Sequence, residues 1–282
     1  MEKKEELPLP WERSRILLGL LIIYAFFEGS AQWLGSDRGQ AGLIVGAIVI
    51  ATGLGVERVI FGRRISEALL ALGLGLPTAR GYVIAIGAVA VLLLMLIVFG
   101  RSAAISIELT RDAFWLMPGL FAQGGVGEEM LFRGFLYRHF RSRRSRWHAA
   151  TLSMLPFAAV HLLLFLALPW HIALAGWLAS VALSFPLAHL FEISGNSLWP
   201  PALVHFVIQA VPKVVVVSNA PSWVFPIFWM ILTVLVLWLM LAADYAVQRK
   251  LKAVPRFDAP FPGRRRPDDR DTEGRAYVLA KH

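Results

Sequence analysis

Apolar residues run in long stretches along most of the chain, and short polar or charged segments separate them. A helix needs about 20 apolar residues to cross a hydrocarbon layer about 30 Å thick. Three stretches meet this requirement plainly, at residues 16–33, 81–100 and 223–245. A fourth, at 39–56, is rich in glycine. These stretches predict helices that span a membrane.

Four more apolar stretches carry polar residues inside them: 112–137, 147–168, 172–191 and 197–217. With the first four, they predict an all-α, polytopic membrane protein with about eight transmembrane helices. The organisation predicted along the chain is a cytoplasmic N-terminal segment (1–15), N-terminal transmembrane helices (16–111), a core that carries polar residues (112–217), a last transmembrane helix (218–248) and a basic cytoplasmic tail (249–282). The tail has too few apolar residues to pack, and we expect it to be disordered.

The composition supports a protein of the bilayer. Hydrophobic residues make up 57% of the chain and charged residues 17%, whereas ordinary soluble domains have about 45–50% and about 25%. The length of 282 residues would allow two soluble domains, but the long apolar stretches exclude them. The absence of cysteine from the sequence excludes a disulfide framework, a cysteine-ligated metal site and a thiol nucleophile.

The basic residues are distributed unevenly between the two sides of the predicted bundle. With both termini inside, 23 Lys and Arg residues lie in cytoplasmic segments and 4 lie outside, while Arg133 falls within a span. The positive-inside rule therefore predicts a multi-pass protein of the cell membrane with both termini cytoplasmic. The net charge of +9 indicates attraction to anionic membrane lipid rather than to nucleic acid.

The first predicted span contains a sequence that bears on its processing. Gly29, Ser30 and Ala31 faintly resemble a signal-peptidase site, and cleavage there would leave seven spans. The carboxylate of Glu28 and the apolar residues that continue to Trp33 favour a retained anchor instead.

Two carboxylates and an arginine stand inside the predicted span 112–137. A charge in the middle of a bilayer costs about 2.5–3.5 kcal/mol on insertion scales, so each demands an explanation. Glu129 and Arg133 are one helical turn apart, acid first, which predicts an ion pair that could simply fix helix packing. Glu128 points about 100° away, and an unpaired carboxylate suits a general base. The glycines just before the pair would let another helix or a substrate backbone come close.

Two histidines occupy other predicted spans, each with a partner one turn away. Phe157 precedes His161, and Gln209 follows His205, so each pair lies on one helix face. A single membrane histidine is commonly just hydrogen-bonded to a neighbouring helix. At about 1.5 Å per residue, however, both histidines and Glu128 lie about 12–20 Å from the cytoplasmic ends of their spans, so the three can meet. We expect His189 and Glu192 at the membrane interface.

These residues resemble those of a known family, the CPBP intramembrane proteases, also called the type II CAAX prenyl endopeptidase or Abi family. The family pattern is Glu-Glu-x-x-x-Arg, then Phe-x-x-x-His, then His-x-x-x-Asn or Asp, on three helices in that order. The matching residues lie within 112–217 and are Glu128, Glu129, Arg133, Phe157, His161 and His205. Gln209 stands where the family has Asn, and it keeps an amide N–H donor.

The resemblance implies an eight-helix protease that cuts peptide bonds within or beside the membrane. It implies that Glu128 activates the attacking water with help from His161, and that His205 and Gln209 stabilise the oxyanion. The supporting residues that it implies are Glu129, Arg133 and Phe157. The implied substrate is a protein or peptide with a membrane-proximal tail: a prenylated C-terminus, a leader peptide and a sorting signal all remain open.

The same resemblance leaves the cofactor open. Some members of the family are described as metal-dependent, and Glu128, His161 and His205 would form a two-His, one-carboxylate set for a divalent metal such as zinc. A glutamate mechanism without metal explains the same residues, and no HExxH sequence decides between the two. We favour the metal-free mechanism and keep zinc as the alternative.

Two further classes of protein stay open. A protein that only binds in the membrane, such as a degraded protease or an immunity factor, is favoured by the departure at Gln209. A transporter with a Glu/His proton relay would need polar groups across the whole bilayer, and here they cluster at one depth. Serine hydrolysis is not supported, because the sequence has no Gly-x-Ser-x-Gly context.

Overall fold

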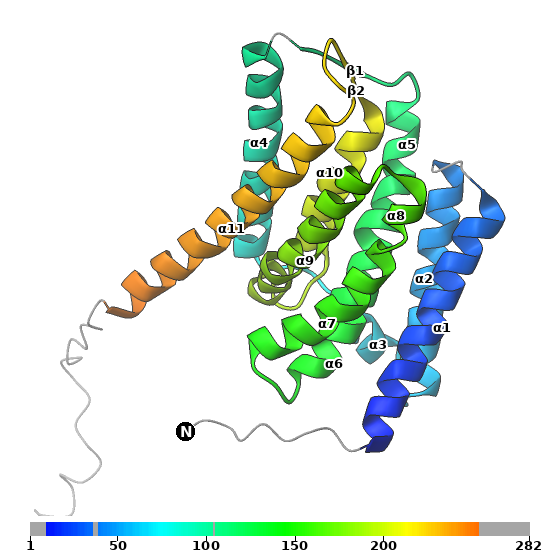
Figure 1. The fold of residues 1–282 in the computed structure, drawn as a ribbon. Helices are drawn as coiled ribbons and strands as arrows, with labels where there is room; N and C mark the ends of the chain where they lie inside the picture. The colour runs from blue at the N-terminus through cyan, green and yellow to red at the C-terminus, as the bar shows by residue number, and fades with distance from the viewer. Residues whose placement is uncertain (1–9, 36–38, 104, 254–282) are drawn as a thin grey trace, which may run out of the picture. The chain divides into compact units, whose positions relative to one another are not determined.

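The structure, a computed structural model, describes residues 10–35, 39–103 and 105–253. Apart from two short strands it is helical, as the apolar stretches predict (Figure 1). The elements are α1 (Pro10–Leu34), α2 (Gln40–Val59), α3 (Ile65–Ala71), α4 (Ala79–Ser102), β1 (Ser106–Leu109), α5 (Ala113–Leu120), η1 (Phe121–Gly127), η2 (Met130–Tyr137), α6 (Arg138–Arg141), α7 (Arg146–His161), α8 (Leu164–Ala167), α9 (Trp170–Ile193), α10 (Trp199–Val214), β2 (Val215–Ser218) and α11 (Val224–Ala253).

Six helical segments within the described ranges are long and apolar enough to cross a membrane: Trp11–Leu34, Gln40–Val59, Ala79–Ser102, Arg146–Ala167, Trp170–Ile193 and Val224–Lys250. The all-α, polytopic membrane fold is therefore confirmed, whereas the count of eight is not. The two predicted spans without such a helix are 112–137 and 197–217, which carry the glutamates and His205. The first is divided among several helical segments, and α10 has only 16 residues, about 24 Å of helix.

Residues 113–141 combine α-helical turns with wider π-helical ones. The segments η1 and η2 are π-helical, and Glu128 and Glu129 lie at the junction between them. Wide turns of this kind are frequent at functional sites, because they alter the direction of side chains relative to a regular helix.

The glycines of η1 allow α10 to come very close. A Cβ atom on Gly125 would lie 2.9 Å from the carbonyl oxygen of Ala202, and one on Gly124 would collide with the side chain of Gln209. The close approach of another helix, predicted from the glycines before the glutamate pair, is confirmed. The contact brings α10 side by side with η1 and so sets His205 and Gln209 against the two glutamates.

Two hydrophobic clusters hold the helices together on either side of this contact. One joins α1, α2 and η2 with parts of α7 and α9, and the other joins α4, α9, α10 and α11. Many large apolar side chains point outward instead, among them Leu21, Ile86 and Leu239. Exposed apolar surface of this extent is typical of a face that contacts lipid or a partner.

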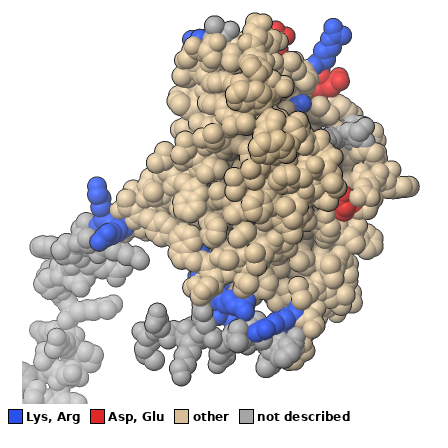
Figure 2. Space-filling model, viewed as in Figure 1, with Lys and Arg blue, Asp and Glu red and all other residues tan. Residues whose placement is uncertain are grey.

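The compact unit that ends at Asp244 has two distinct ends. At one end β1 pairs antiparallel with β2, with Ser106 opposite Ser218, near the end of α1 and the start of α2 (Figure 1, top). At the other end lie α6 and most of the arginines, and Figure 2 shows lysine and arginine side chains gathered there, at the bottom of the view. We call these the strand end and the arginine-rich end.

Candidate active site

Glu129 forms the buried centre of the site. Arg133 Nη1 donates to Glu129 Oε1 at 2.8 Å, and His205 Nδ1 lies 2.6 Å from the same oxygen. The side chains of Glu129 and Arg133 are 0% and 3% exposed. The ion pair expected from the one-turn spacing is therefore confirmed, and α10 adds a third member to it.

Glu128, the neighbouring carboxylate, is in a different environment. Gln209 Nε2 donates to Glu128 Oε1 at 2.8 Å. The nearest approach of His205 is 3.7 Å, from its Nε2 to Glu128 Oε2, which is too long for a hydrogen bond. With 17% of its side chain exposed, Glu128 presents Oε2 without a hydrogen-bond donor among the described residues.

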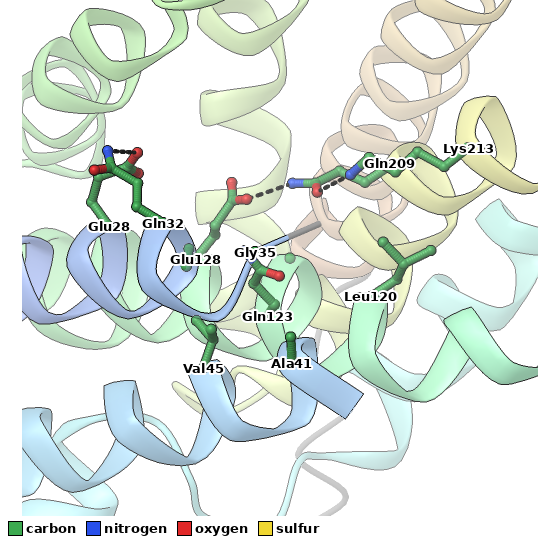
Figure 3. A pocket seen from close by; sticks show the side chains of 12 residues that line it. Glu28, Gln32, Gly35, Ala41, Val45, Leu120, Gln123, Glu128, Gln209 and Lys213 are labelled. Atoms are coloured by element: carbon green, nitrogen blue, oxygen red, sulfur yellow. Dashed lines mark hydrogen bonds between the residues drawn. The ribbon is translucent and has the colours of Figure 1, made fainter. Parts of the chain in front are cut away.

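Gln209 connects the site residues to Lys213. Its Nε2 lies 2.9 Å from His205 Nε2, and Lys213 Nζ donates to its Oε1 at 3.2 Å (Figure 3). A lysine can only donate and an ionised carboxylate can only accept, so these partners fix the orientation of the amide. His205 Nε2 is then an acceptor, and its Nδ1–H donates to Glu129. The network assigns His205 as a neutral ring in one tautomer.

Phe157 packs between the two histidine rings. The ring centroid of Phe157 lies 4.4 Å from that of His161 and 5.9 Å from that of His205. The Arg133 guanidinium carbon lies 4.7 Å from the centroid of the Phe157 ring, within the range of a cation–π contact. Residues of all three sequence motifs thus meet around this ring.

His161 is held by its own helix. Its Nδ1 lies 2.8 Å from the carbonyl oxygen of Phe157, so Nδ1–H donates and Nε2 stays an acceptor. Within the described part of the chain, no hydrogen bond joins His161 to Glu128. The structure brings His161 to the site through Phe157 rather than by direct contact with the carboxylate.

A cavity of about 310 Å³ extends from Glu128 (Figure 3). Its size lies at the lower end of the range of about 300–1,000 Å³ for ligand pockets. Glu128 and Gln209 line the cavity together with Glu28, Ala31, Gln32, Gly35, Ala41, Val45, Leu120, Gln123, Gly124 and Lys213. Of the two adjacent glutamates, only Glu128 therefore faces space that a substrate and a water molecule could occupy.

The arrangement does not fit a metal ion. A catalytic zinc site uses three protein ligands, each about 2.0–2.2 Å from the metal for nitrogen and oxygen donors. Across the ranges that the structure describes, no group of three or more His, Cys, Asp or Glu side chains is placed to hold a metal. Both nitrogens of His205 are also engaged, one with Glu129 and the other with Gln209.

Several polar residues of the site were not identified from the sequence. Lys213, one of the four basic residues assigned to the outside, follows Gln209 by one helical turn, as Gln209 follows His205. Glu28, Gln32 and Gln123 line the cavity. The signal that could have found them is the presence of polar side chains inside apolar stretches, the criterion that singled out Glu128.

A second polar network lies near the arginine-rich end. Glu192 accepts hydrogen bonds from Tyr137 at 2.7 Å and from Arg146 at 2.5 Å. Arg141 donates to the same carboxylate. His189 Nε2 lies 2.9 Å from Asp244 Oδ2, and Arg80 pairs with the other oxygen of Asp244. His189 and Glu192, which we expect at the membrane interface, lie between helices near the arginine-rich end, with 3% and 12% of their side chains exposed. We call this the closed network: Arg80, Tyr137, Arg141, Arg146, His189, Glu192 and Asp244.

The fold and the site together define a class of protein. Several apolar helices form a membrane protein, and two glutamates, an arginine, two histidines and an amide meet inside it beside a cavity. Such a set, with a carboxylate facing the cavity, is typical of an enzyme that moves protons.

Comparison with protein families agrees with this class. Residues 110–211 match the family described as type II CAAX prenyl endopeptidase Rce1-like. The resemblance to the CPBP family is thereby confirmed over this segment, which includes every motif residue. The match indicates a membrane protease whose substrate is a peptide or protein. No curated protein matches the chain.

Proposed function

We propose that this protein is an intramembrane endopeptidase in which Glu128 activates water without a metal. The observation that carries the proposal is the difference between the two adjacent glutamates. Each glutamate keeps one oxygen without a hydrogen-bond donor, but that of Glu129 is buried beside Arg133 and His205, whereas Glu128 is partly exposed and lines the cavity. A general base needs such an accessible acceptor.

The reaction starts with a water molecule between Glu128 Oε2 and the carbonyl carbon of the scissile bond. The oxygen of the water molecule bonds to that carbon while Glu128 takes a proton from the water. The carbonyl oxygen becomes an oxyanion. Glu128 then gives the proton to the amide nitrogen, the C–N bond breaks, and an acid and an amine leave. His161, whose Nε2 is not bonded to Phe157, takes the remaining acidic proton from the product carboxylic acid as it leaves.

Gln209 links the protonation of Glu128 to the stabilisation of the oxyanion. Before reaction its two N–H groups face Glu128 and His205. Once Glu128 has taken a proton it loses its negative charge and becomes a weaker acceptor, since hydrogen bonds to ionised groups are the stronger ones. The Gln209 N–H can then turn to the oxyanion as the charge develops there, which is where such a donor contributes most.

The test compares wild type with Glu128→Gln, both purified in nanodiscs and given a library of quenched fluorescent peptides with and without a prenylated C-terminus. We expect turnover by wild type, no turnover by Glu128→Gln, and no change when a chelator is added. Loss of wild-type turnover with the chelator, restored by zinc, would contradict the metal-free mechanism. Equal turnover by both proteins would contradict the role of Glu128 and leave the non-enzymatic partner as the better interpretation.

A further inference from the structure

The residues that line the cavity at Glu128 come from segments toward one end of the molecule. Its walls are the last turns of α1, the first turns of α2, the segment from Leu120 to Glu128, and the last turns of α10. In Figure 1 the end of α1, the start of α2 and the end of α10 lie toward the strand end. Gly35, Ala41 and Lys213 carry the lining to that end. None of the described arginines lines the cavity.

The basic residues mark the opposite end as cytoplasmic. The described arginines at the arginine-rich end are Arg13, Arg15, Arg58, Arg63, Arg64, Arg80, Arg138, Arg141, Arg143, Arg144 and Arg146. The described basic residues at the strand end are Arg101, Arg111 and Lys213. An excess of arginine and lysine marks the cytoplasmic side of a membrane protein, so the strand end lies on the other side.

The side chains of the cavity fit an extended peptide. A peptide backbone inside a membrane protein needs partners for both its N–H and its C=O groups, because lipid offers none. Gln32 and Gln123 line the cavity, and a side-chain amide has both a donor and an acceptor. Glu28, held by Gln32 at 2.9 Å, and Lys213 add one charge of each sign to the lining.

We propose that the substrate is an extended peptide segment that reaches Glu128 from the strand end, on the non-cytoplasmic face of the membrane. The proposal rests on the proposed peptidase and adds the side of access and the substrate class: a segment of an exported peptide or of the outer part of a membrane protein. A tail that stays in the cytoplasm would meet the arginine-rich end, and none of the arginines named there lines this cavity.

The absence of cysteine from the chain makes a direct test possible. Single cysteines are introduced as Gln40→Cys at the strand end, Gln123→Cys inside the cavity, and Ser142→Cys at the arginine-rich end, where Gln40 and Ser142 are exposed. Intact cells are treated with a membrane-impermeant maleimide, before and after permeabilisation. The matched control is wild type, which has no thiol to react.

We expect Gln40→Cys and Gln123→Cys to react in intact cells and Ser142→Cys to react only after permeabilisation. Reaction of Gln123→Cys only after permeabilisation, its failure to react at all, or reaction of Ser142→Cys in intact cells would each overturn the proposal. Labelling needs no turnover, and we expect the same pattern in a Glu128→Gln background. A failure of the proposed peptidase would therefore leave the labelling pattern intact, and the two failures can be told apart.

Discussion

The protein holds two polar networks that share glutamate, histidine and arginine, and their carboxylates have different surroundings. In the closed network, both oxygens of Glu192 and both oxygens of Asp244 have a hydrogen-bond partner. In the active-site network, Glu128 and Glu129 both have hydrogen-bond partners on Oε1 only; Oε2 of Glu129 is buried, whereas Glu128 lines the cavity. Glutamate, histidine and arginine occur in both, so residue type alone does not distinguish a structural network from a chemical one.

The difference shows what makes a buried carboxylate available for chemistry. A carboxylate whose oxygens are all bonded to arginine, tyrosine or histidine is held in its charged form and has no room for a substrate. The closed network joins η2, α4, α6, α7, α9 and α11, so its bonds serve helix packing. Glu128 has instead an adjacent cavity, and we expect its reactivity to follow from that space, since the oxygen of Glu129 that lacks a partner is buried.

The sharpest test of the comparison exchanges a carboxylate for an amide in each network. Glu128→Gln should lower turnover by about 10²–10⁴-fold, because the amide cannot take a proton from water, while the folded yield stays that of wild type. The matched control Glu192→Gln should lower stability by about 1–3 kcal/mol through weaker charged hydrogen bonds and keep turnover per folded molecule. Turnover of peptide in nanodiscs and the thermal midpoint of the purified protein are the two measurements.

The second test concerns the buried neighbour of Glu128. Glu129→Gln should lower the folded yield as well as turnover, because it leaves Arg133 as a buried charge without its counter-ion, at a cost of about 3–5 kcal/mol. The yield of monodisperse protein on size exclusion measures the first effect. A Glu129→Gln protein that purifies like wild type would show that the Glu129–Arg133 pair is not needed for packing.

Gln209 tests whether the amide between the two carboxylates acts on the chemical step. Gln209→Leu keeps the approximate volume and removes the N–H, so single-turnover cleavage should slow by about 10²–10³-fold, as for other oxyanion donors. Gln209→Asn, which restores the residue common in the family, should keep substantial activity. Unchanged cleavage by Gln209→Leu would contradict the oxyanion role of Gln209 and leave the proposed mechanism without a side-chain donor, since the Nδ1–H of His205 is bonded to Glu129.

The smallest effect is expected at Lys213, which holds the Gln209 amide at 3.2 Å. Lys213→Met removes one exposed hydrogen bond, worth about 0.5–1.5 kcal/mol, and should lower the maximal rate by about three- to tenfold. Because Lys213 acts through Gln209, Lys213→Arg should restore the rate, and Lys213→Met should add little to Gln209→Leu. Full additivity of the two changes would show that Lys213 acts independently, for example on substrate binding.

Local sequence predicted those features that depend on a single helix. The apolar stretches gave six of the spans, and one-turn spacing gave the Glu129–Arg133 pair and the contact between His205 and Gln209. These predictions succeed because residues three or four apart on a helix are neighbours whatever the rest of the chain does. The site residues as a set came from the three motifs, which lie within the segment 110–211 that matches the family.

Only the tertiary structure decided how these pieces meet. On α10, His205 is the partner of Glu129 and Gln209 is the partner of Glu128, at separations of 76 and 81 residues along the chain. The close contact of η1 with α10 at its glycines makes these hydrogen bonds possible. Helix packing likewise made His189 and Glu192 parts of one network between helices and left Glu128 beside a cavity. Sequence alone determined which charged groups lie among apolar residues; which of their atoms stay without a partner depends on side-chain contacts between distant helices, which no local spacing contains.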